Sequence, residues 1–378
     1  MDWCKESPSY CEPAPLPVCR AGTGTQTGSE AYLGRSKMKA AVFHGIKDVR
    51  LEEIEVPRIS PYEVLVKVKA ALTCGTDRKM YLRGHPLFKP PFVFGHEFAG
   101  EIIKVGKKVK GFQKGMRVVA ANSAPCNRCY YCKIGRQSMC ENLTLRLSGA
   151  FAQYVEVLGP IVEQNLLEIP SHLSYKKAAL VEPLACVVHG IEESNIALGD
   201  TVVINGLGPI GLLYIQLAKL KGARVIALDV KKERLDIANR LGADELVNVS
   251  GAIDEVKAVR KLTEEGRGVD IVIEAVGIPE VWEKSILMAR KGGTVILFGG
   301  CPSGTKIAID TELLHYSEVT IKGVFHHTPQ YVTRALNLIS QGKINTDSLI
   351  TDEFPLADFS RVLKMMINQE GIKIAVIP

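Results

Sequence analysis

Apolar residues between positions 190 and 325 follow two alternating periods. Apolar runs typical of buried strands cover residues 201–205, 223–229, 245–249, 269–277, 293–300 and 319–325. Segments with helical spacing lie between them, over residues 209–222, 233–243, 252–265 and 279–290. Strands that alternate with helices in this way predict an α/β domain, in which a doubly wound parallel sheet is covered by helices on both faces.

Residues 38–160 show a different pattern, with short strand-like runs punctuated by glycine and proline. The clearest runs cover residues 64–71, 92–106 and 117–121. They predict an irregular, barrel-like β domain. Beyond the α/β segment, residues 331–344 have helical spacing, and we expect the strand-like tail IKIAVIP to rejoin the first domain.

The chain therefore divides into three predicted parts. They are an extension over residues 1–37, a first domain over 38–188 that 327–378 complete, and a second domain over 189–326. The extension is rich in proline and offers few apolar residues to bury, so we expect it to be disordered or loosely docked. The spacing of its cysteines fits neither a zinc motif nor a disulfide framework; they are Cys4, Cys11 and Cys19.

Composition narrows the class of protein. A chain of 378 residues exceeds one compact domain, and its net charge of +6 is spread without a basic block, so we expect no nucleic-acid partner. No window holds 18 consecutive apolar residues, so we expect no membrane span. The start lacks a secretory signal, which favours the cytoplasm, where clustered thiols bind metal rather than form disulfides.

A glycine-rich segment follows the predicted strand 201–205 and opens the next helix. It consists of Gly206, Leu207, Gly208, Pro209, Ile210 and Gly211. The first glycine allows a tight turn, the second lets the backbone approach a pyrophosphate, and the third lets helix and strand pack closely. The strand, the glycines and the helix come in the order that a dinucleotide-binding site requires.

Asp229 ends the next predicted strand and bears on the choice of cofactor. A carboxylate there accepts hydrogen bonds from the ribose hydroxyls and repels a 2′-phosphate, which favours NAD over NADP. Lys231 and Lys232 follow closely and weaken that argument. The alternative is that Asp229 only caps the helix over 231–241.

Four cysteines are spaced Cys-x2-Cys-x2-Cys-x7-Cys; they are Cys126, Cys129, Cys132 and Cys140. Four thiolates satisfy a tetrahedral zinc completely, which predicts a structural metal site. An iron–sulfur cluster is the rival, but the bacterial ferredoxin run has a gap of three residues before its last cysteine and a proline after it. The gap of seven and the following Glu141 favour zinc.

Other metal-capable residues stand apart along the chain. Cys74 lies in ALTCGTD, His96 and Glu97 lie in GHEFAG, and Glu182 lies in ALVEPLAC. A catalytic zinc needs such ligands together with an open position for water or substrate. Taken singly, Cys74 is equally well explained as a buried apolar thiol, and His96 as a core histidine.

Taken together, these motifs resemble the zinc-dependent medium-chain alcohol dehydrogenases. The resemblance rests on GHEFAGEIIKVGKKV, the four-cysteine loop, CGTD and the glycine fingerprint, and it covers residues 38–378 in unbroken order. It implies a GroES-like irregular β-barrel as the catalytic domain, followed by a Rossmann domain. It also implies homodimers or homotetramers that carry one catalytic and one structural zinc in each chain.

The resemblance assigns roles to single residues. Cys74 and His96 match the catalytic zinc ligands, and Glu97 matches an acid that binds the zinc in some branches and supports it in others. Glu182 stands where the classical enzymes have a ligand cysteine, which resembles the polyol, threonine and sugar dehydrogenase branch. Thr76 matches the hydroxyl that accepts the substrate proton.

Further implied roles concern the cofactor, the proton and the substrate. Arg234 matches a basic residue near the adenosine end of the cofactor. Lys79 replaces a histidine that passes the proton to solvent, which a lysine can do only with a depressed pKa; His85 or the ribose and water are the alternatives. His326 and His327 either line the substrate pocket or lie at the surface. The basic residues near Lys79 suit a phosphorylated polyol or simply form a solvated face; they are Lys79, Arg83 and Lys89.

We therefore expect reversible oxidation of a secondary alcohol by hydride transfer to NAD. The substrate is a polyol, a sugar alcohol, a diol or a threonine-like alcohol. Two rival functions remain: a zinc-free quinone-type reductase of the same fold, and a non-catalytic protein that binds nucleotide or zinc. A zinc-free reductase would lack the metal ligands that this chain has. A non-catalytic protein gives no reason for the position of Thr76 close to Cys74.

Overall fold

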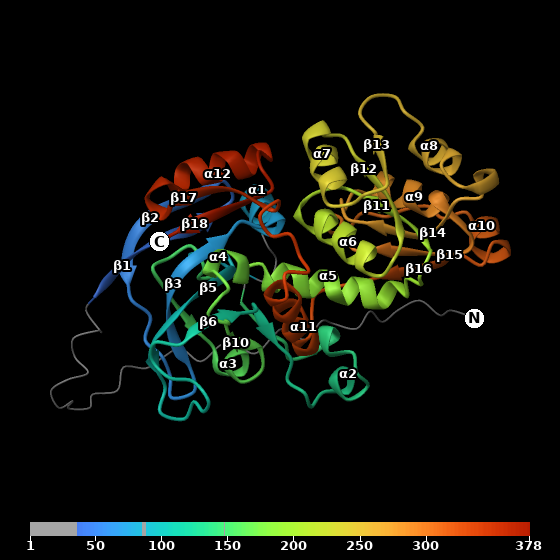
Figure 1. Ribbon diagram of the computed structural model, residues 1–378. Helices are drawn as coiled ribbons and strands as arrows, with labels where there is room; N and C mark the ends of the chain where they lie inside the picture. Colours follow the sequence, from blue (N-terminus) through green and yellow to red (C-terminus); the bar gives the residue numbers. More distant parts are fainter. Residues whose placement is uncertain (1–35, 85–87, 147) are drawn as a thin grey trace, which may run out of the picture.

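The computed structural model describes residues 36–84, 88–146 and 148–378 (Figure 1). Most of the predicted extension with its three cysteines, and His85, lie outside the described residues. Figure 1 shows two lobes, one built around β3, β5 and β18 and the other around β11 to β16, with helices α5 and α11 between them.

The second lobe is an α/β domain around a six-stranded parallel sheet. Its strands are β11 (Thr201–Asn205), β12 (Arg224–Asp229), β13 (Glu245–Asn248), β14 (Val269–Glu274), β15 (Ala289–Leu297) and β16 (Thr320–Gly323). Its helices are α6 (Pro209–Leu220), α7 (Lys232–Arg240), α8 (Glu255–Lys261), α9 (Pro279–Met288) and α10 (Thr311–Tyr316). The strand order β13-β12-β11-β14-β15-β16 is that of a Rossmann fold, whose order reverses beside β11. The predicted parallel sheet is confirmed.

One predicted helix of this lobe is too long. The pattern predicts a helix over 252–265, but α8 begins at Glu255, because the side chain of Asp254 accepts a hydrogen bond from the amide of Lys257 and caps the helix. A separate 3-10 turn covers Glu264–Gly266, and its Glu265 has a left-handed φ of 52° that a continuous helix does not allow.

The first lobe is an irregular β domain. Its main seven-stranded sheet has the order β10-β6-β5-β3-β18-β17, with β9 also paired to β3. These strands are β3 (Val64–Leu72), β5 (Glu97–Val105), β6 (Arg117–Ala120), β9 (Tyr154–Val157), β10 (Leu166–Glu168), β17 (Ile350–Pro355) and β18 (Lys373–Ile377). Smaller sheets join β1 (Lys37–Gly45), β2 (Asp48–Glu55) and β4 (Phe92–Val93), and β7 (Ser123–Ala124) with β8 (Thr144–Leu145). The irregular β domain that the sequence predicts is confirmed.

The tail of the chain returns to this lobe, as its strand pattern predicts. β18 pairs antiparallel with β3 and parallel with β17. The helices of the first lobe and its C-terminal return are α1 (Gly75–Arg83), α2 (Tyr130–Lys133), α3 (Gly159–Asn165), α4 (Tyr175–Ala178), α11 (Pro329–Ser340) and α12 (Phe359–Asn368). Short 3-10 turns cover Gln137–Met139 and Leu356–Asp358.

The apolar run that predicts one strand over 92–106 is split in two. β4 ends at Val93 and β5 begins at Glu97. Gly95 between them has a left-handed φ of 84°, and a Cβ atom on it would lie 2.5 Å from the ring of Phe151. Only glycine fits this bend, which places His96 between the two strands.

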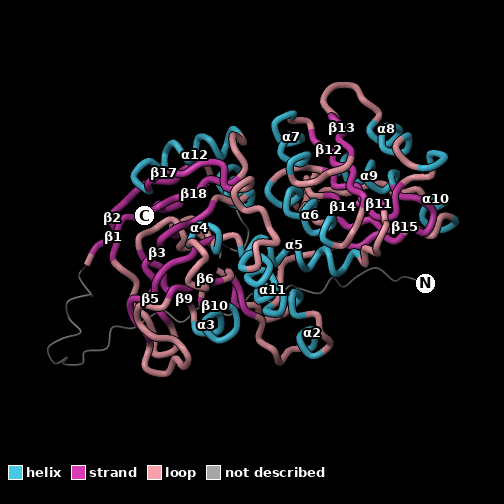
Figure 2. The backbone as a smooth tube through the Cα atoms, in the orientation of Figure 1, coloured by secondary structure: helices cyan, strands magenta, loops and turns pink. Residues whose placement is uncertain are grey.

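Helix α5 (Val181–Ser194) connects the two lobes (Figure 2). The predicted boundary between residues 188 and 189 falls inside this continuous helix. Its buried side chains share one apolar core with residues of both lobes, such as Val119 from β6 and Leu213 from α6. A Cβ atom on Gly190 would lie 1.7 Å from the hydroxyl oxygen of Tyr214, so glycine lets α5 approach α6 closely.

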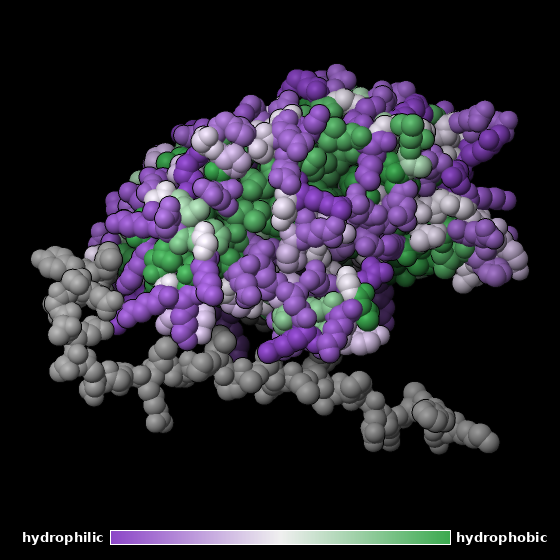
Figure 3. Space-filling model, turned by 60° about the horizontal axis from the view of Figure 1, so that its bottom comes forward, coloured by the Kyte–Doolittle hydropathy of each residue, from purple (hydrophilic) through white to green (hydrophobic). Residues whose placement is uncertain are grey.

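Polar side chains cover much of the face in Figure 3, with apolar groups gathered in areas between them. Exposed apolar side chains include Tyr316 beside the sheet edge and Tyr130 on the four-cysteine loop. None of the helices in the described ranges is both long and apolar enough to cross a membrane.

Candidate metal and cofactor sites

Hydrogen bonds to the thiol and to the backbone amide of Cys74 place this residue at the start of helix α1. Its Sγ accepts a hydrogen bond from the amide of Thr76 at 3.5 Å, and its own amide donates to the carboxylate of Asp77 at 2.9 Å. This reciprocal arrangement is a capping box, which fixes the cysteine at the point where β3 gives way to α1.

His96 is 3% exposed, and its Nδ1 lies 3.0 Å from Oδ1 of the same Asp77. A carboxylate on Nδ1 orients an imidazole and leaves Nε2 available for a metal. Asp77 therefore anchors Cys74 by a hydrogen bond and lies close to His96, although its Oδ1 and the histidine Nδ1 do not form a hydrogen bond here. Sequence reasoning missed this role, although the motif CGTD carried its signal in the capping-box spacing.

Glu97 meets a buried lysine from the other end of the chain. Lys373 Nζ lies 2.7 Å from Oε1 and 2.5 Å from Oε2 of Glu97, and it also donates to the carbonyl of Thr73 at 3.0 Å. Burial lowers the pKa of Lys373, but the Glu97 carboxylate more than offsets this, so its pKa is raised and the ammonium stays charged. No local sequence signal points to Lys373, because the partners are 276 residues apart.

Three predicted ligands come together as one group. The ligand atoms of Cys74, His96 and Glu97 all lie within 4.8 Å of one another. One sulfur, one imidazole and one carboxylate form a donor set that fits zinc. Glu182 lies outside this group at the start of α5, where it is 5% exposed and burial raises its pKa to about 7.

The two histidines of uncertain role are buried beside Glu182. His327 Nε2 lies 4.0 Å from Glu182 Oε1 and 3.0 Å from Asn122 Oδ1. His326 Nε2 shares a hydrogen bond with the hydroxyl of Ser123. Asn122 also lines a small cavity with His96, and both His326 and His327 are buried and do not lie at the surface. Sequence reasoning missed Asn122 and Ser123, which belong to no motif.

Lys79 lies on α1, and its Nζ donates to the carbonyl of Gly300 at 3.2 Å. This contact joins the helix that follows Cys74 to the loop after β15. Burial lowers the pKa of Lys79, and the nearby charge of Arg83 lowers it further. Burial therefore shifts the pKa of Lys79 in the direction that a proton-relay lysine needs.

The four-cysteine loop gathers its sulfurs as its spacing predicts. The Sγ atoms of Cys126, Cys129, Cys132 and Cys140 all lie within 4.8 Å of one another. A hydrogen bond from the backbone of Arg128 lowers the pKa of the Cys126 thiol to about 6, which favours the thiolate that binds metal. Burial raises the pKa of Cys132 to about 12, so four thiolates together require a cation.

The glycine-rich segment has the geometry of a dinucleotide loop. Gly206 has a left-handed φ of 96°, and a Cβ atom on Gly211 would lie 1.9 Å from the carbonyl oxygen of Gly206. Space is open where Gly208 would carry a Cβ atom, at the N-terminus of α6. A pyrophosphate fits this position, because the helix N-terminus favours an anion and nothing blocks the backbone.

Asp229 is buried at the end of β12 and reaches back to the glycine loop. Its Oδ2 accepts a hydrogen bond from the amide of Leu207 at 2.7 Å, and its Oδ1 accepts one from the amide of Lys231 at 2.8 Å. Arg234 Nη1 lies 3.7 Å from Oδ2. The acid therefore ties the end of β12 to the nucleotide loop, and no side chain caps the first turn of α7.

Comparison with known proteins agrees with this geometry. Residues 60–171 match the family model of the alcohol dehydrogenase GroES-like domain, and residues 209–341 match that of zinc-binding dehydrogenases. Sorbitol dehydrogenase of Bacillus subtilis strain 168 is 33% identical over 353 residues, which are 90% of this chain and 97% of the relative. The chain belongs to the zinc-dependent medium-chain alcohol dehydrogenases. It falls in their sorbitol-dehydrogenase-like branch.

Other similar proteins extend the comparison. Erythritol/L-threitol dehydrogenase of Mycolicibacterium smegmatis is 33% identical to this dehydrogenase over 90% of the chain and 98% of the relative. The structure of 2R,3R-butanediol dehydrogenase from Bacillus subtilis has a TM-score of 0.80 and 32% identity, and covers 90% of this chain and 99% of the other. A chain from Sinorhizobium meliloti 1021, solved with NADP bound, has a TM-score of 0.83 and 34% identity, and covers 91% and 100%.

The buried ion pair predicts a large stability effect. Replacing Lys373 by methionine leaves the buried Glu97 carboxylate without its cation, so we expect Lys373→Met to lower the free energy of unfolding by about 3–5 kcal/mol. Denaturant unfolding of both variants after a chelator has removed the zinc measures this, because a zinc ion on Glu97 would replace the lysine charge. The control Lys364→Met, at an exposed position on α12, should change it by less than about 0.5 kcal/mol. Equal effects of the two changes would contradict the assignment.

The buried histidine pair predicts a loss of stability in acid. Burial, helped by the nearby charges of His96 and His189, lowers the pKa of His326 from 6.5 to about 4. At a pH between these two values, His326 is protonated in the unfolded chain but neutral in the folded protein. The free energy of unfolding therefore falls as the pH drops from 6.5 towards 4.

Between pH 7 and pH 5 this one group should cost about 2 kcal/mol of unfolding free energy. We expect His326→Asn to lose correspondingly less stability over the same interval than the unchanged protein, as denaturant unfolding at the two pH values would measure. Parallel losses in both proteins would show that His326 is not the group responsible.

Proposed function

We propose that this dehydrogenase reversibly oxidises a secondary alcohol that carries further hydroxyl groups, with NAD as the hydride acceptor. The proposal rests on the ligand atoms of Cys74, His96 and Glu97, which all lie within 4.8 Å of one another. Lys79, on the helix that follows Cys74, also contacts the cofactor domain at Gly300. Polyols and diols suit the site best, because relatives at 32–33% identity are named for sorbitol, erythritol or threitol, and butanediol.

The proposed metal holders follow from the donor sets. Cys74, His96 and Glu97 hold a catalytic zinc, with Glu182 as a further acid facing it, and the four-cysteine loop holds a structural zinc. When bound, the catalytic zinc lowers the pKa of an alcohol hydroxyl, and NAD supplies the hydride acceptor. Asp77 holds Cys74 in place and lies beside His96. Lys373 neutralises the charge of the Glu97 carboxylate.

The chain's own residues are proposed to move the proton and fix the substrate. Thr76, one turn before Lys79 on α1, relays the substrate's hydroxyl proton, because its Oγ1 accepts that proton while its own hydroxyl proton moves on towards Lys79. Lys79, with its depressed pKa, passes that proton on towards solvent. His326 and His327 line the substrate side of the site, where their neutral rings offer hydrogen bonds without charge.

The proposed cofactor is NAD, held by the loop from Gly206 to Gly211, with Arg234 near its adenosine end. Asp229 lies beside that loop, and its carboxylate disfavours a 2′-phosphate. The expected assembly, a homodimer or homotetramer, and the expected cytoplasmic location stay predictions. Support for self-association comes from the sheet edge at β16, which lies next to the exposed aromatic residues Tyr316 and Phe325.

Metal content and activity together test the catalytic site. We expect the purified protein to hold about two zinc ions per chain and to reduce NAD with members of an alcohol panel that contains sorbitol, erythritol and 2,3-butanediol. Cys74→Ser should lose one zinc and lower kcat by more than about 100-fold, because a ligand is removed.

The matched variant Cys129→Ser should lose the other zinc and chiefly lower thermal stability, because its loop has little core of its own. A protein with one zinc that Cys74→Ser leaves in place would contradict the catalytic site. Elemental analysis and initial rates distinguish these results. Activity that persists without zinc would favour the quinone-type reductase.

Cofactor choice is tested at Asp229. Asp229→Asn keeps an acceptor for the Leu207 amide but removes the charge, so we expect the ratio of kcat/KM for NAD to that for NADP to fall about tenfold. The control Asp236→Asn changes a carboxylate on the exposed face of α7 and should leave the ratio unchanged. An unchanged protein that prefers NADP would contradict the proposal.

A further inference from the structure

Two lysines, one from each lobe, donate a hydrogen bond to a backbone carbonyl of the other lobe. Lys79 lies on α1 of the first lobe, and its Nζ donates to the carbonyl of Gly300, after β15, at 3.2 Å. Lys231 lies just before α7 of the second lobe, and its Nζ donates to the carbonyl of Gln369, at the end of α12, at 2.9 Å. The lobes are therefore joined by two contacts that run in opposite directions.

On the second lobe, these contacts lie on either side of the glycine loop at the carboxyl edge of the parallel sheet. Lys231 follows β12, the glycine loop follows β11, and Gly300 follows β15, in the strand order β12-β11-β14-β15. A dinucleotide lies across this edge, where the strand order reverses. The proposed cofactor would therefore have its adenosine end near Lys231 and its nicotinamide end near Gly300.

The loop that receives Lys79 is fixed within the second lobe. The amide of Gly299 donates to the carbonyl of Glu274 at 3.0 Å, and Nε1 of Trp282 donates to the carbonyl of Gly299 at 3.0 Å. Gly300 is therefore the next residue of a loop that is tied both to β14 and to α9. A contact there acts on the whole second lobe.

The first lobe connects its own two anchor points. Arg78, next to Lys79 on α1, donates from Nε to the carbonyl of Ile367 at 3.1 Å. Ile367 lies two residues before Gln369. Helix α1 and the end of α12 are thus joined, and the two interlobe contacts are made by one surface of the first lobe.

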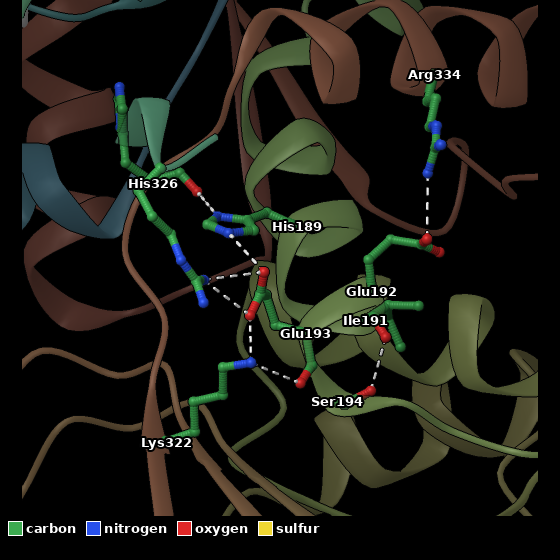
Figure 4. Close-up of polar contacts among 9 residues, drawn as sticks. His189, Ile191, Glu192, Glu193, Ser194, Lys322, His326 and Arg334 are labelled. Carbon is green, nitrogen blue, oxygen red and sulfur yellow. Dashed lines mark hydrogen bonds and ion pairs between the residues drawn. The ribbon is translucent and has the colours of Figure 1, made fainter. Parts of the chain in front are cut away.

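Helix α5 holds the lobes together elsewhere (Figure 4). Its Glu193 forms ion pairs with Lys322 of β16 and with Arg136 of the four-cysteine loop, so one side chain contacts both lobes. Buried side chains of α5 also pack in a core that both lobes share. Figure 1 shows α5 between the lobes, with α1, α12 and α7 above it. Separation at α5 would expose this core, so we expect the lobes to part at the two lysine contacts.

We propose that Lys79 and Lys231 hold the two lobes together over the cofactor and thereby set the rate at which the reduced cofactor leaves. Lys79 is then a positioning residue in addition to its proposed part in proton transfer. The proposal rests on the proposed function, because it requires a nicotinamide dinucleotide between the lobes. Release requires both contacts to break, since they lie at the two ends of that dinucleotide.

The test is the dissociation rate of NADH from the zinc-loaded protein, measured by displacement in a stopped-flow instrument. We expect Lys79→Met and Lys231→Met each to release NADH about fivefold faster, because each change removes one hydrogen bond from a charged donor. In the double variant the two factors should multiply to about 25-fold, because the contacts are independent.

Lys232→Met is the matched control for the loss of a positive charge. Nζ of Lys232 bonds to Asp236 of the same helix, at 2.8 Å, instead of crossing to the first lobe. A solvated charge affects chiefly the association rate of an anionic ligand, so the dissociation rate should stay unchanged. The proposal is overturned if Lys79→Met and Lys231→Met release NADH no faster than Lys232→Met does.

Lys79→Arg separates the contact from proton transfer. The guanidinium can still donate to Gly300 but does not lose a proton, so we expect NADH release within about twofold of the unchanged protein. The value of kcat should fall at least about tenfold, because the relay is lost. Release from Lys79→Arg as fast as that from Lys79→Met would show that the interlobe hydrogen bond is not what slows it.

A second measurement needs no cofactor and separates this proposal from the proposed function. In a Trp3→Phe background, Trp282 is the single tryptophan and reports on the loop that Lys79 contacts. Acrylamide quenching of its fluorescence should rise about twofold in Lys79→Met and stay unchanged in Lys79→Arg. If neither NADH nor NADPH binds, the proposed function fails, and the quenching still decides the contact. Equal quenching in all three proteins overturns it.

Discussion

The ion pair between Lys373 and Glu97 joins the last strand of the chain to the strand that follows His96, a proposed metal ligand. Both side chains are at most 1% exposed, so each charge depends on the other. β18 pairs with β3, and from that position Lys373 reaches both Thr73 and Glu97. These contacts hold the C-terminal segment in the first domain. The negative charge of Glu97, beside the proposed zinc ligands Cys74 and His96, is thereby neutralised by a residue of the same chain.

Helix α5 connects the two domains and packs in a core that both of them share. It carries the buried Glu182 near its start and His189 two turns later, where His189 donates to the carbonyl of His326, and Gly190 lets the helix approach α6 closely. Groups on one rigid helix keep a fixed separation, which loops do not guarantee. On the other side of the site, the contact of Lys79 with Gly300 brings α1 to the cofactor domain. The alcohol and the nicotinamide are proposed to meet between these two contacts.

The four-cysteine loop contributes to the site without touching it. A metal held by four thiolates would fix a loop that has little core, and Arg136 in that loop contacts Glu193, which lies beside His189. The four-cysteine loop and the loop of His326 and His327 are therefore linked through Glu193 and His189. This gives a physical reason for building a second metal site into an enzyme that performs its chemistry elsewhere.

Local pattern in the sequence was enough for the features that depend on neighbouring residues. Apolar periodicity predicted the parallel sheet, the glycine spacing predicted the nucleotide loop, and the cysteine spacing predicted the sulfur cluster, because each is encoded within a few turns or strands. The capping by Asp254 and the bend at Gly95 moved element boundaries that periodicity alone cannot place. Lys373, His189 and Asn122 were decided only by the tertiary structure, since their partners lie more than 100 residues away and no local spacing records such contacts.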